Sequence, residues 1–152
     1  MEFGNLADLT AHIERLAAGM ASASSTESGL EKAAKLLEDK AKETVGEYHD
    51  AIGPAPAWAD LADATKADRV AKGFHEDEPL LRTGALRDSI SHEVAGHEAW
   101  IGSDSEIAEY HETGTSRMPP RPIFGTALYG NIDQAVDAIG HAATVHISGG
   151  KG

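Results

Sequence analysis

The spacing of apolar residues changes near Ile90, from the three-and-four pattern of a helix to the alternation of a strand. The first alternating segment runs from Ile90 to Ala95, and a second runs from Glu98 to Ile101 beyond Gly96. This pattern predicts a β-hairpin over about residues 89–102, with a tight turn near Gly96. Because two strands alone are marginal in water, helices or another subunit's strands must cover their apolar face. We therefore expect an α+β fold, in which this small antiparallel sheet packs with N-terminal and C-terminal helices.

Two helices are predicted at the start of the chain. The first extends from about Asn5 to Met20 on a single apolar face. The second begins in the Ser-rich segment 21–28, where Ser24 and Ser28 each have a Glu three residues later, and it ends near Gly46. Its apolar stripe is Leu30, Ala33, Ala34, Leu37, Ala41 and Val45. Glu31/Lys35 and Glu38/Lys42 have the spacing of ion pairs along this helix.

Shorter helices are predicted around the hairpin. One is expected from Trp58 to Lys72, and Thr83 is a suitable N-cap for a turn over residues 85–87. After the hairpin we expect a helix over residues 105–111, a loop over 114–122 and a last helix from about Pro122. The apolar residues Ile132, Val136, Ile139 and Ala143 continue this last helix. The whole is expected to be one domain over residues 1–148, followed by a flexible tail over 149–152.

Composition excludes several classes of protein. The absence of cysteine removes disulfides and thiolate metal sites. No basic leader and no long apolar run are present, so we expect synthesis in the cytoplasm without a membrane span. The net charge of -12 disfavours general binding to nucleic acid. Between Glu112 and Asp133 the only charged residues are Arg117 and Arg121, which form a basic window in an acidic chain.

No catalytic template fits well. His92 and His97 flank a Glu93-containing segment that resembles a zinc-binding His-Glu-x-x-His helix, but the segment is one residue too long and lies in the predicted hairpin. Glu106, Glu109 and Glu112 have the spacing of a solvated helix face. Two alternatives stay open: a metal-dependent hydrolase that uses His92, His97 and His111, and a cytoplasmic nucleic-acid-binding regulator.

A series of short motifs in fixed order carries a resemblance. The series is Trp58-x-x-Leu61-x-x-x-Thr65, Leu81-x-x-Gly84-x-Leu86-x-x-Ser89-Ile90, Trp100-Ile101-Gly102-Ser103, Ala108-x-Tyr110-His111-Glu112-x-Gly114-Thr115 and Pro119-Pro120-Arg121-Pro122-Ile123-Phe124. In order and spacing it resembles the neck and tail-completion proteins of long-tailed bacteriophages, which include minor tail, virion-morphogenesis and head-to-tail joining groups. The resemblance covers about residues 58–128, and Ile123 stands where the family pattern has Phe directly after the Arg-Pro pair.

The resemblance implies a structural virion protein of the neck and tail, assembled in the host cytoplasm. Such a protein forms a homo-oligomeric ring, with six subunits expected, and contacts the head-connector or stopper ring and the tail-tube protein. DNA passes through as cargo, and neither catalysis, nor a metal, nor a cofactor is implied. We expect an assembly interface over the motif residues Arg82, Gly84, Leu86, Tyr110, Glu112, Gly114, Thr115, Arg117, Pro120, Arg121, Pro122 and Phe124. Within it, Arg121 is expected to pair with a carboxylate of a neighbouring subunit.

Overall fold

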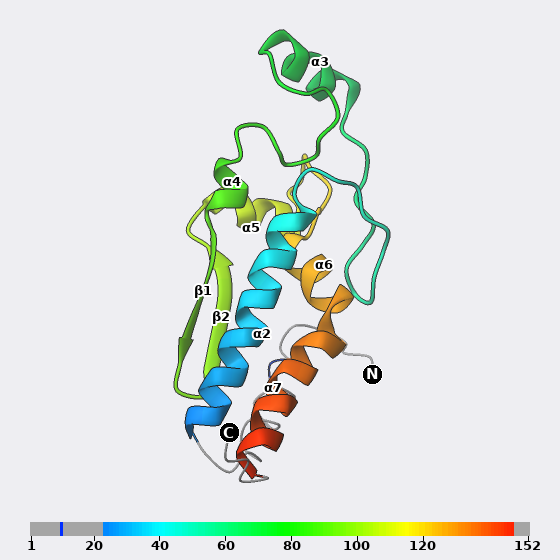
Figure 1. The fold of residues 1–152 in the computed structure, drawn as a ribbon. Helices are drawn as coiled ribbons and strands as arrows, with labels where there is room; N and C mark the ends of the chain where they lie inside the picture. Colours follow the sequence, from blue (N-terminus) through cyan, green and yellow to red (C-terminus); the bar gives the residue numbers. More distant parts are fainter. Residues whose placement is uncertain (1–9, 11–22, 148–152) are drawn as a thin grey trace.

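The computed structural model describes Thr10 and residues 23–147 (Figure 1). The expected helix from Asn5 to Met20, apart from Thr10, and the expected tail over 149–152 lie outside the described residues. The described elements are α2 (Ala23–Thr44), α3 (Asp63–Ala71), α4 (Ala85–Asp88), β1 (Ile90–Ala95), β2 (Glu98–Ser103), α5 (Glu106–Thr113), α6 (Ile123–Gly130) and α7 (Ile132–Ile147). The predicted α+β class is confirmed, because helices pack around one antiparallel pair of strands.

Helix α2 is the central element, with the hairpin on one side and α6 and α7 on the other (Figure 1). The apolar stripe predicted for it is buried along its whole length. The helix ends at Thr44 because Gly46 has a φ of 106° and donates its N–H to the carbonyl of Pro79 at 2.9 Å. Its start at Ala23 places Ser28 inside the helix, so Ser28 is not the N-cap.

The ion pairs along α2 were predicted only in part. Glu38 and Lys42 pair at 2.5 Å as expected, but Lys35 pairs with Asp39 rather than with Glu31. Glu31 instead contacts the His92 imidazole of β1 at 2.8 Å. The correction has a tertiary cause, because the hairpin packs against this side of α2 and offers Glu31 a partner that helix spacing does not reveal.

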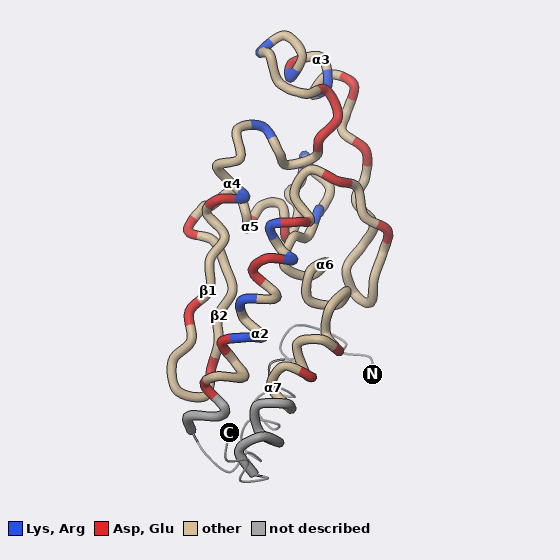
Figure 2. Tube along the Cα trace, in the orientation of Figure 1, with Lys and Arg blue, Asp and Glu red and all other residues tan. Residues whose placement is uncertain are grey.

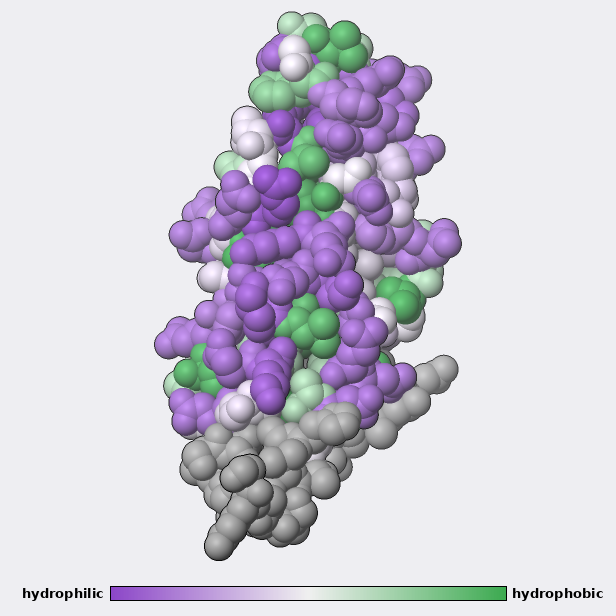
Figure 3. Space-filling model, viewed as in Figure 1, coloured by the Kyte–Doolittle hydropathy of each residue, from purple (hydrophilic) through white to green (hydrophobic). Residues whose placement is uncertain are grey.

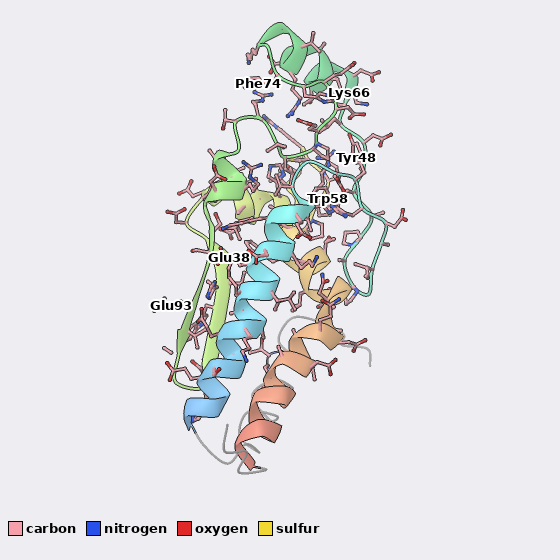
Figure 4. The ribbon with its side chains drawn as sticks, in the orientation of Figure 1. Glu38, Tyr48, Trp58, Lys66, Phe74 and Glu93 are labelled. Atoms are coloured by element: carbon pink, nitrogen blue, oxygen red, sulfur yellow. The ribbon has the colours of Figure 1, made fainter. Side chains whose placement is uncertain are left out.

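The predicted hairpin is present, with its turn at the predicted place. Its pairs run from Ile90 with Ser103 to Ala95 with Glu98, and the turn is Gly96-His97. Gly96 has a φ of 62°, which suits the first central residue of a two-residue hairpin turn. One face of the sheet packs toward α2, while the other is exposed and carries Glu93 opposite Trp100. Figure 4 shows Glu93 on the side of the hairpin that points away from α2.

The C-terminal helix predicted as one element is two. Helix α6 ends at Gly130 and α7 begins at Ile132, with Asn131 between them at φ −133°. Asn131 donates its side-chain amide to the carbonyl of Ala127 at 2.8 Å, and its own carbonyl accepts the N–H of Ala135 at 3.1 Å. Gly and Asn are poor helix formers, and this Asn satisfies backbone groups of both helices at the break. Periodicity alone does not locate such a break, because apolar residues recur on both sides of it.

Helix α3 lies at the end of an arm, residues 59–82, that projects from the body (Figure 1). The prediction of a helix from Trp58 to Lys72 was too long, because the helix is confined to Asp63–Ala71. Trp58 is 5% exposed and its N–H bonds to the carbonyl of His49 at 2.8 Å, so this residue belongs to the core rather than to the arm. At the base of the arm, Tyr48 donates its hydroxyl to Asp77 at 2.5 Å and accepts the N–H of Leu61 at 3.0 Å.

The short elements around the hairpin were predicted closely. Helix α5 covers the predicted segment and extends it to Thr113, and the predicted turn after Thr83 is α4. The N-cap of α4 is Gly84 rather than Thr83, although the Thr83 hydroxyl accepts the N–H of Ala85 at 3.3 Å. Gly84 has a φ of 88°, which explains the glycine of the Leu-x-x-Gly-x-Leu motif.

The core has two parts along α2. The first joins α2 to α7 around Leu30, Leu37 and Ile139, and the second joins the other end of α2 to Trp58, Ile90 and Ile123. The motif segments therefore meet in the second part. Among the described residues, no helix combines the length and the apolar character of a membrane span.

Candidate assembly site

Glu112 connects α5 to the start of α6. Its carboxylate accepts the backbone N–H groups of Ile123, Phe124 and Gly125 at 2.8, 3.0 and 2.8 Å. These are N–H groups that a helix leaves without intrahelical partners, so Glu112 acts as a cap supplied by another helix. Burial raises the pKa of Glu112, while the three N–H groups oppose that shift. The expectation of a solvated face for Glu106, Glu109 and Glu112 is therefore wrong for Glu112 and holds for the two exposed residues.

The Gly-Thr pair after α5 turns the chain back toward α6. Gly114 has a φ of 73°, and a Cβ there would lie 2.8 Å from the backbone nitrogen of Pro120. Thr115 and Met118 exchange backbone hydrogen bonds at 2.9 and 3.3 Å, and Arg121 donates its N–H to the carbonyl of His111 at 2.7 Å. The loop is thus fixed by close packing at a position that only glycine fits.

Arg121 is buried, at 5% exposure, and is bound within its own chain. Its Nε donates to the carbonyl of Ala59 and one terminal nitrogen donates to that of Asp60, both at 2.8 Å. The guanidinium therefore holds the base of the arm against the loop before α6. This geometry does not fit the expectation that Arg121 pairs with a carboxylate of a neighbouring subunit, because its side chain is turned into the protein.

Trp58 completes the same corner. Its indole N–H donates to the carbonyl of Pro122 at 3.2 Å, and that carbonyl also accepts the hydroxyl of Thr126 at 2.6 Å. The ring of His49 meets the indole edge to face, with centroids 4.8 Å apart. Trp58 and Pro122 belong to different motifs and are more than 60 residues apart in the sequence. This hydrogen bond from a side chain to the backbone joins the two motifs.

The twelve motif residues expected at an interface fall into two groups. Arg82, Tyr110, Thr115 and Arg117 are exposed. The others are buried or half-buried and hold the chain together: Gly84, Leu86, Glu112, Gly114, Pro120, Arg121, Pro122 and Phe124. An external partner can therefore contact the first group directly. The second group packs inside the protein and fixes the backbone that carries the first group.

The three histidines of the hydrolase alternative lie in different surroundings. His92 on β1 bonds through Nε2 to Glu31 at 2.8 Å and through Nδ1 to Glu38. His97 is exposed in the hairpin turn, and His111 is half-buried in α5, where burial and the nearby Arg121 charge lower its pKa. Within the part of the chain that the structure describes, no three His, Asp or Glu side chains are grouped so that they could hold a metal ion.

His92 and its partners form a charged cluster between β1 and α2. The hydrogen bonds that His92 donates to the carboxylates of Glu31 and Glu38 raise the pKa of His92. The bonds from Lys42 and His92 lower the pKa of Glu38 to about 2. Glu38 is 9% exposed, so its charge is compensated by two cationic partners where water has little access. The cluster has a structural explanation as the link that fixes the hairpin to α2.

Exposed apolar side chains were the feature that sequence reasoning missed. They include Val70 of α3, Trp100 of β2, and Ile107 and Tyr110 of α5, which are between 48% and 56% exposed. Figure 3 shows apolar surface over the α3 end of the molecule, within a largely polar face. Apolar spacing does not show that Val70 is exposed, because the pattern gives the apolar side of a helix but not the direction in which that side points.

Charge is distributed unevenly over the fold. Figure 2 shows acidic residues along most of the described chain, whereas Lys and Arg residues lie mainly on α2 and on the arm. Arg117 is an exposed cation of the loop that joins α5 to α6. Of the two residues of the predicted basic window, Arg117 is therefore at the surface, whereas Arg121 is buried.

Comparison with known proteins gives one match. The sequence pattern of the phage virion morphogenesis family matches residues 6–147, which is nearly the whole chain. Neither the curated proteins nor the solved structures include one that matches the chain significantly. The matched range contains every element described above.

Proposed function

The chain belongs to the phage virion morphogenesis family, and we propose that it is a structural protein of the neck that completes the tail and joins it to the head. In this role it assembles as a ring, with six subunits expected, between the head connector or stopper ring and the tail tube. DNA passes through the channel of the ring. The role requires neither catalysis nor a cofactor, and the protein resides in the virion after assembly in the host cytoplasm.

The family match over residues 6–147 is the observation that carries this proposal. The construction of the corner around Glu112 supports it. Buried bonds fix the loop between α5 and α6, while Thr115 and Arg117 on the loop and Tyr110 on α5 remain exposed. A rigid loop with exposed side chains loses little conformational freedom when a partner binds, which favours a defined contact.

The net charge of -12 also suits a channel for DNA. An acidic wall repels the phosphate backbone, so DNA slides past it, whereas a basic wall would bind the DNA and slow its passage. Exposed carboxylates occur on the hairpin and α5 as well as on α2, so several faces of the subunit meet this requirement.

Particle analysis tests the proposal. Mass spectrometry of purified virions is expected to detect the chain at a fixed copy number, and deletion of its gene is expected to give heads and tails that do not join. Wild-type protein supplied in trans should restore joined particles. Absence of the chain from intact virions would overturn the proposal.

Arg117 is the suitable residue for an interface variant. Arg117→Glu is expected to reduce joining, and Arg117→Lys, which keeps the charge, should retain most of it. Arg121→Glu is unsuitable because it would place a carboxylate against the carbonyls of Ala59 and Asp60 in the core. Normal joining with Arg117→Glu would exclude Arg117 from the contact while leaving the virion location to be judged by mass spectrometry.

A further inference from the structure

An apolar groove lies along α2, with β2 on one side and α6 and α7 on the other (Figure 1). Its volume is about 380 Å³, far larger than the few voids that protein interiors contain. The floor is formed by small, buried side chains of α2, among them Ala33, Ala34 and Ala41. The walls are also mainly apolar and include Ala99, Leu128 and Ile139. A groove of this size and composition is suited to apolar side chains that fill it and exclude water.

Thr10, from the N-terminal part of the chain, is one of the residues that line this groove. Its backbone is helical and its side chain is exposed. In the sequence Thr10 comes four residues after Leu6 and three before Ile13, so all three share one side of the helix expected over Asn5–Met20. Thr10 is at the edge of that apolar side, which agrees with its exposure. It therefore connects the apolar side of this segment to the groove.

The length of the chain before α2 agrees with this connection. Helix α2 begins at Ala23, so only residues 21–22 separate it from the expected helix, and such short connections join antiparallel helices. Residues at equal distance from the connection then lie side by side, because both helices rise about 1.5 Å per residue. Thr10 is 11 residues before Ala21, and Ala33 is 11 residues after Ser22. Thr10 and Ala33 line the same groove, as an antiparallel arrangement requires.

From these observations we infer that residues 5–20 dock, through their apolar side, in this groove of their own subunit. Small residues in the floor leave room for large ones, and alternation of the two gives close packing of helices. The segment supplies large apolar side chains on that side, at Leu6, Leu9, Ile13, Leu16 and Met20. The groove is then closed by the chain itself and is not a surface for another subunit. The inference does not depend on the proposed ring, because it concerns a single copy.

Engineered cysteines test the position of the segment, because the natural chain has none. The variant Thr10→Cys/His97→Cys has two exposed positions that line the groove, one on the segment and one in the hairpin turn. A short bismaleimide reagent is expected to join the two cysteines within one chain. A mixture of isotope-labelled and unlabelled protein identifies this product by mass spectrometry, since a link between copies joins a labelled peptide to an unlabelled one. Circular dichroism verifies the fold of the variant.

A matched control keeps the cross-link specific. In the control, Ser91→Cys replaces His97→Cys, because Ser91 is exposed on the same hairpin but is about 20 Å along the strand from the turn. The link from Thr10 to position 97 should form several-fold faster than the link to position 91. Equal rates would overturn the inference. Links that form mainly between labelled and unlabelled copies would also overturn it, since the segment would then dock on another subunit.

Two Asp variants give an independent readout. Ile13 is on the apolar side of the expected helix, whereas Ala11 is on the opposite side. Ile13→Asp is expected to lower the midpoint of thermal unfolding by roughly 5 °C or more relative to Ala11→Asp, because it brings a charge into an apolar groove. It should also slow the Thr10–His97 cross-link to the rate of the control. Equal midpoints and an unchanged cross-link would refute the docking. The proposed function is judged separately, by the presence of the chain in virions.

Discussion

At the scale of single residues, Glu112 is the most informative side chain. It is the partner of three backbone N–H groups that α6 cannot satisfy internally. Glu112→Ala is expected to lower the free energy of unfolding by about 2 to 3 kcal/mol, because it leaves these donors without their partner. Glu112→Gln should cost less, about 1 kcal/mol, because its amide oxygen still accepts. Urea unfolding measures both, and equal losses would show that the N–H contacts contribute little.

The same residue gives the stability a dependence on pH. Burial raises the pKa of Glu112 above its ordinary value. A raised pKa contributes stability below the ordinary value, and that contribution is lost as the pH rises through the folded-state pKa. Glu112→Gln lacks this contribution, so its deficit relative to the natural protein should be larger at pH 5 than at pH 8. A deficit that grows toward pH 8 would mean that the bonded carboxylate is favoured by folding instead.

Two glycines allow steric and conformational costs to be separated. Gly114 and Gly96 both have positive φ, but a Cβ at Gly114 meets the Pro120 backbone at 2.8 Å, whereas one at Gly96 meets nothing within 4 Å. Gly96→Ala should therefore cost about 1 to 2 kcal/mol, the price of a left-handed backbone alone. Gly114→Ala should cost roughly 3 kcal/mol or more, because the φ of 73° and ψ of 172° at Gly114 belong to a region that is essentially restricted to glycine, and the close contact adds to that strain. Thermal unfolding of both variants measures the difference, and equal costs would mean that the loop moves freely away from the added methyl.

At the scale of elements, the link between the hairpin and α2 is expected to depend on pH. The pKa of His92 is raised, so its contribution to the stability of the fold is complete below pH 6.5. That contribution is lost as the pH rises through the folded-state pKa. The pKa of Glu38 is lowered to about 2, so its contribution is complete above 4.5 and is lost as the pH falls toward 2. The cluster should therefore stabilise the fold most between about pH 4.5 and 6.5.

His92→Gln tests that window. The variant should be less stable than the natural protein at pH 5.5, and the difference should shrink toward pH 8.5, as the pH rises through the raised pKa of His92. The midpoint of thermal unfolding of both proteins, measured across this pH range, gives the difference. His97→Gln is the matched control, since His97 is exposed in the turn of the same hairpin. A His92→Gln deficit that is constant with pH would show that the imidazole acts through packing alone.

Helices and strands that follow from a local apolar pattern were predictable from sequence, whereas features that depend on tertiary contacts were not. The stripe of α2 and the alternation of the hairpin each follow from one local period, so both were found. Trp58 seemed to begin a helix because its apolar spacing continues into α3, but its indole bonds to Pro122 on a distant segment. Local period likewise gave no sign that Glu112 caps α6 or that Arg121 is buried, since each bonds to backbone groups far away in the sequence.

At the scale of the whole molecule, the chain combines a fixed body with an arm. The two parts of the core join α2 to the hairpin, α6 and α7, while α3 stands away from them (Figure 1). Tyr48 and Arg121 of the body hold the base of the arm, because they form hydrogen bonds with the backbone of Leu61 and Ala59. A projecting and firmly anchored helix is suited to reach a neighbouring subunit without reorganising the body.

Net charge opposes the association of such subunits. Each carries -12, so bringing copies together costs Coulomb energy that salt reduces, with a Debye length of about 10 Å at 0.1 M. The apolar surfaces around Val70, Ile107 and Tyr110 should then associate more readily once repulsion is screened. Sedimentation of the purified chain is expected to show a rising mass between about 20 mM and 300 mM salt. Lowering the pH toward the pI of about 4.9 should act in the same direction, because it removes the negative charge. A mass that falls with salt would show that attraction between opposite charges of two subunits outweighs the repulsion of their net charges.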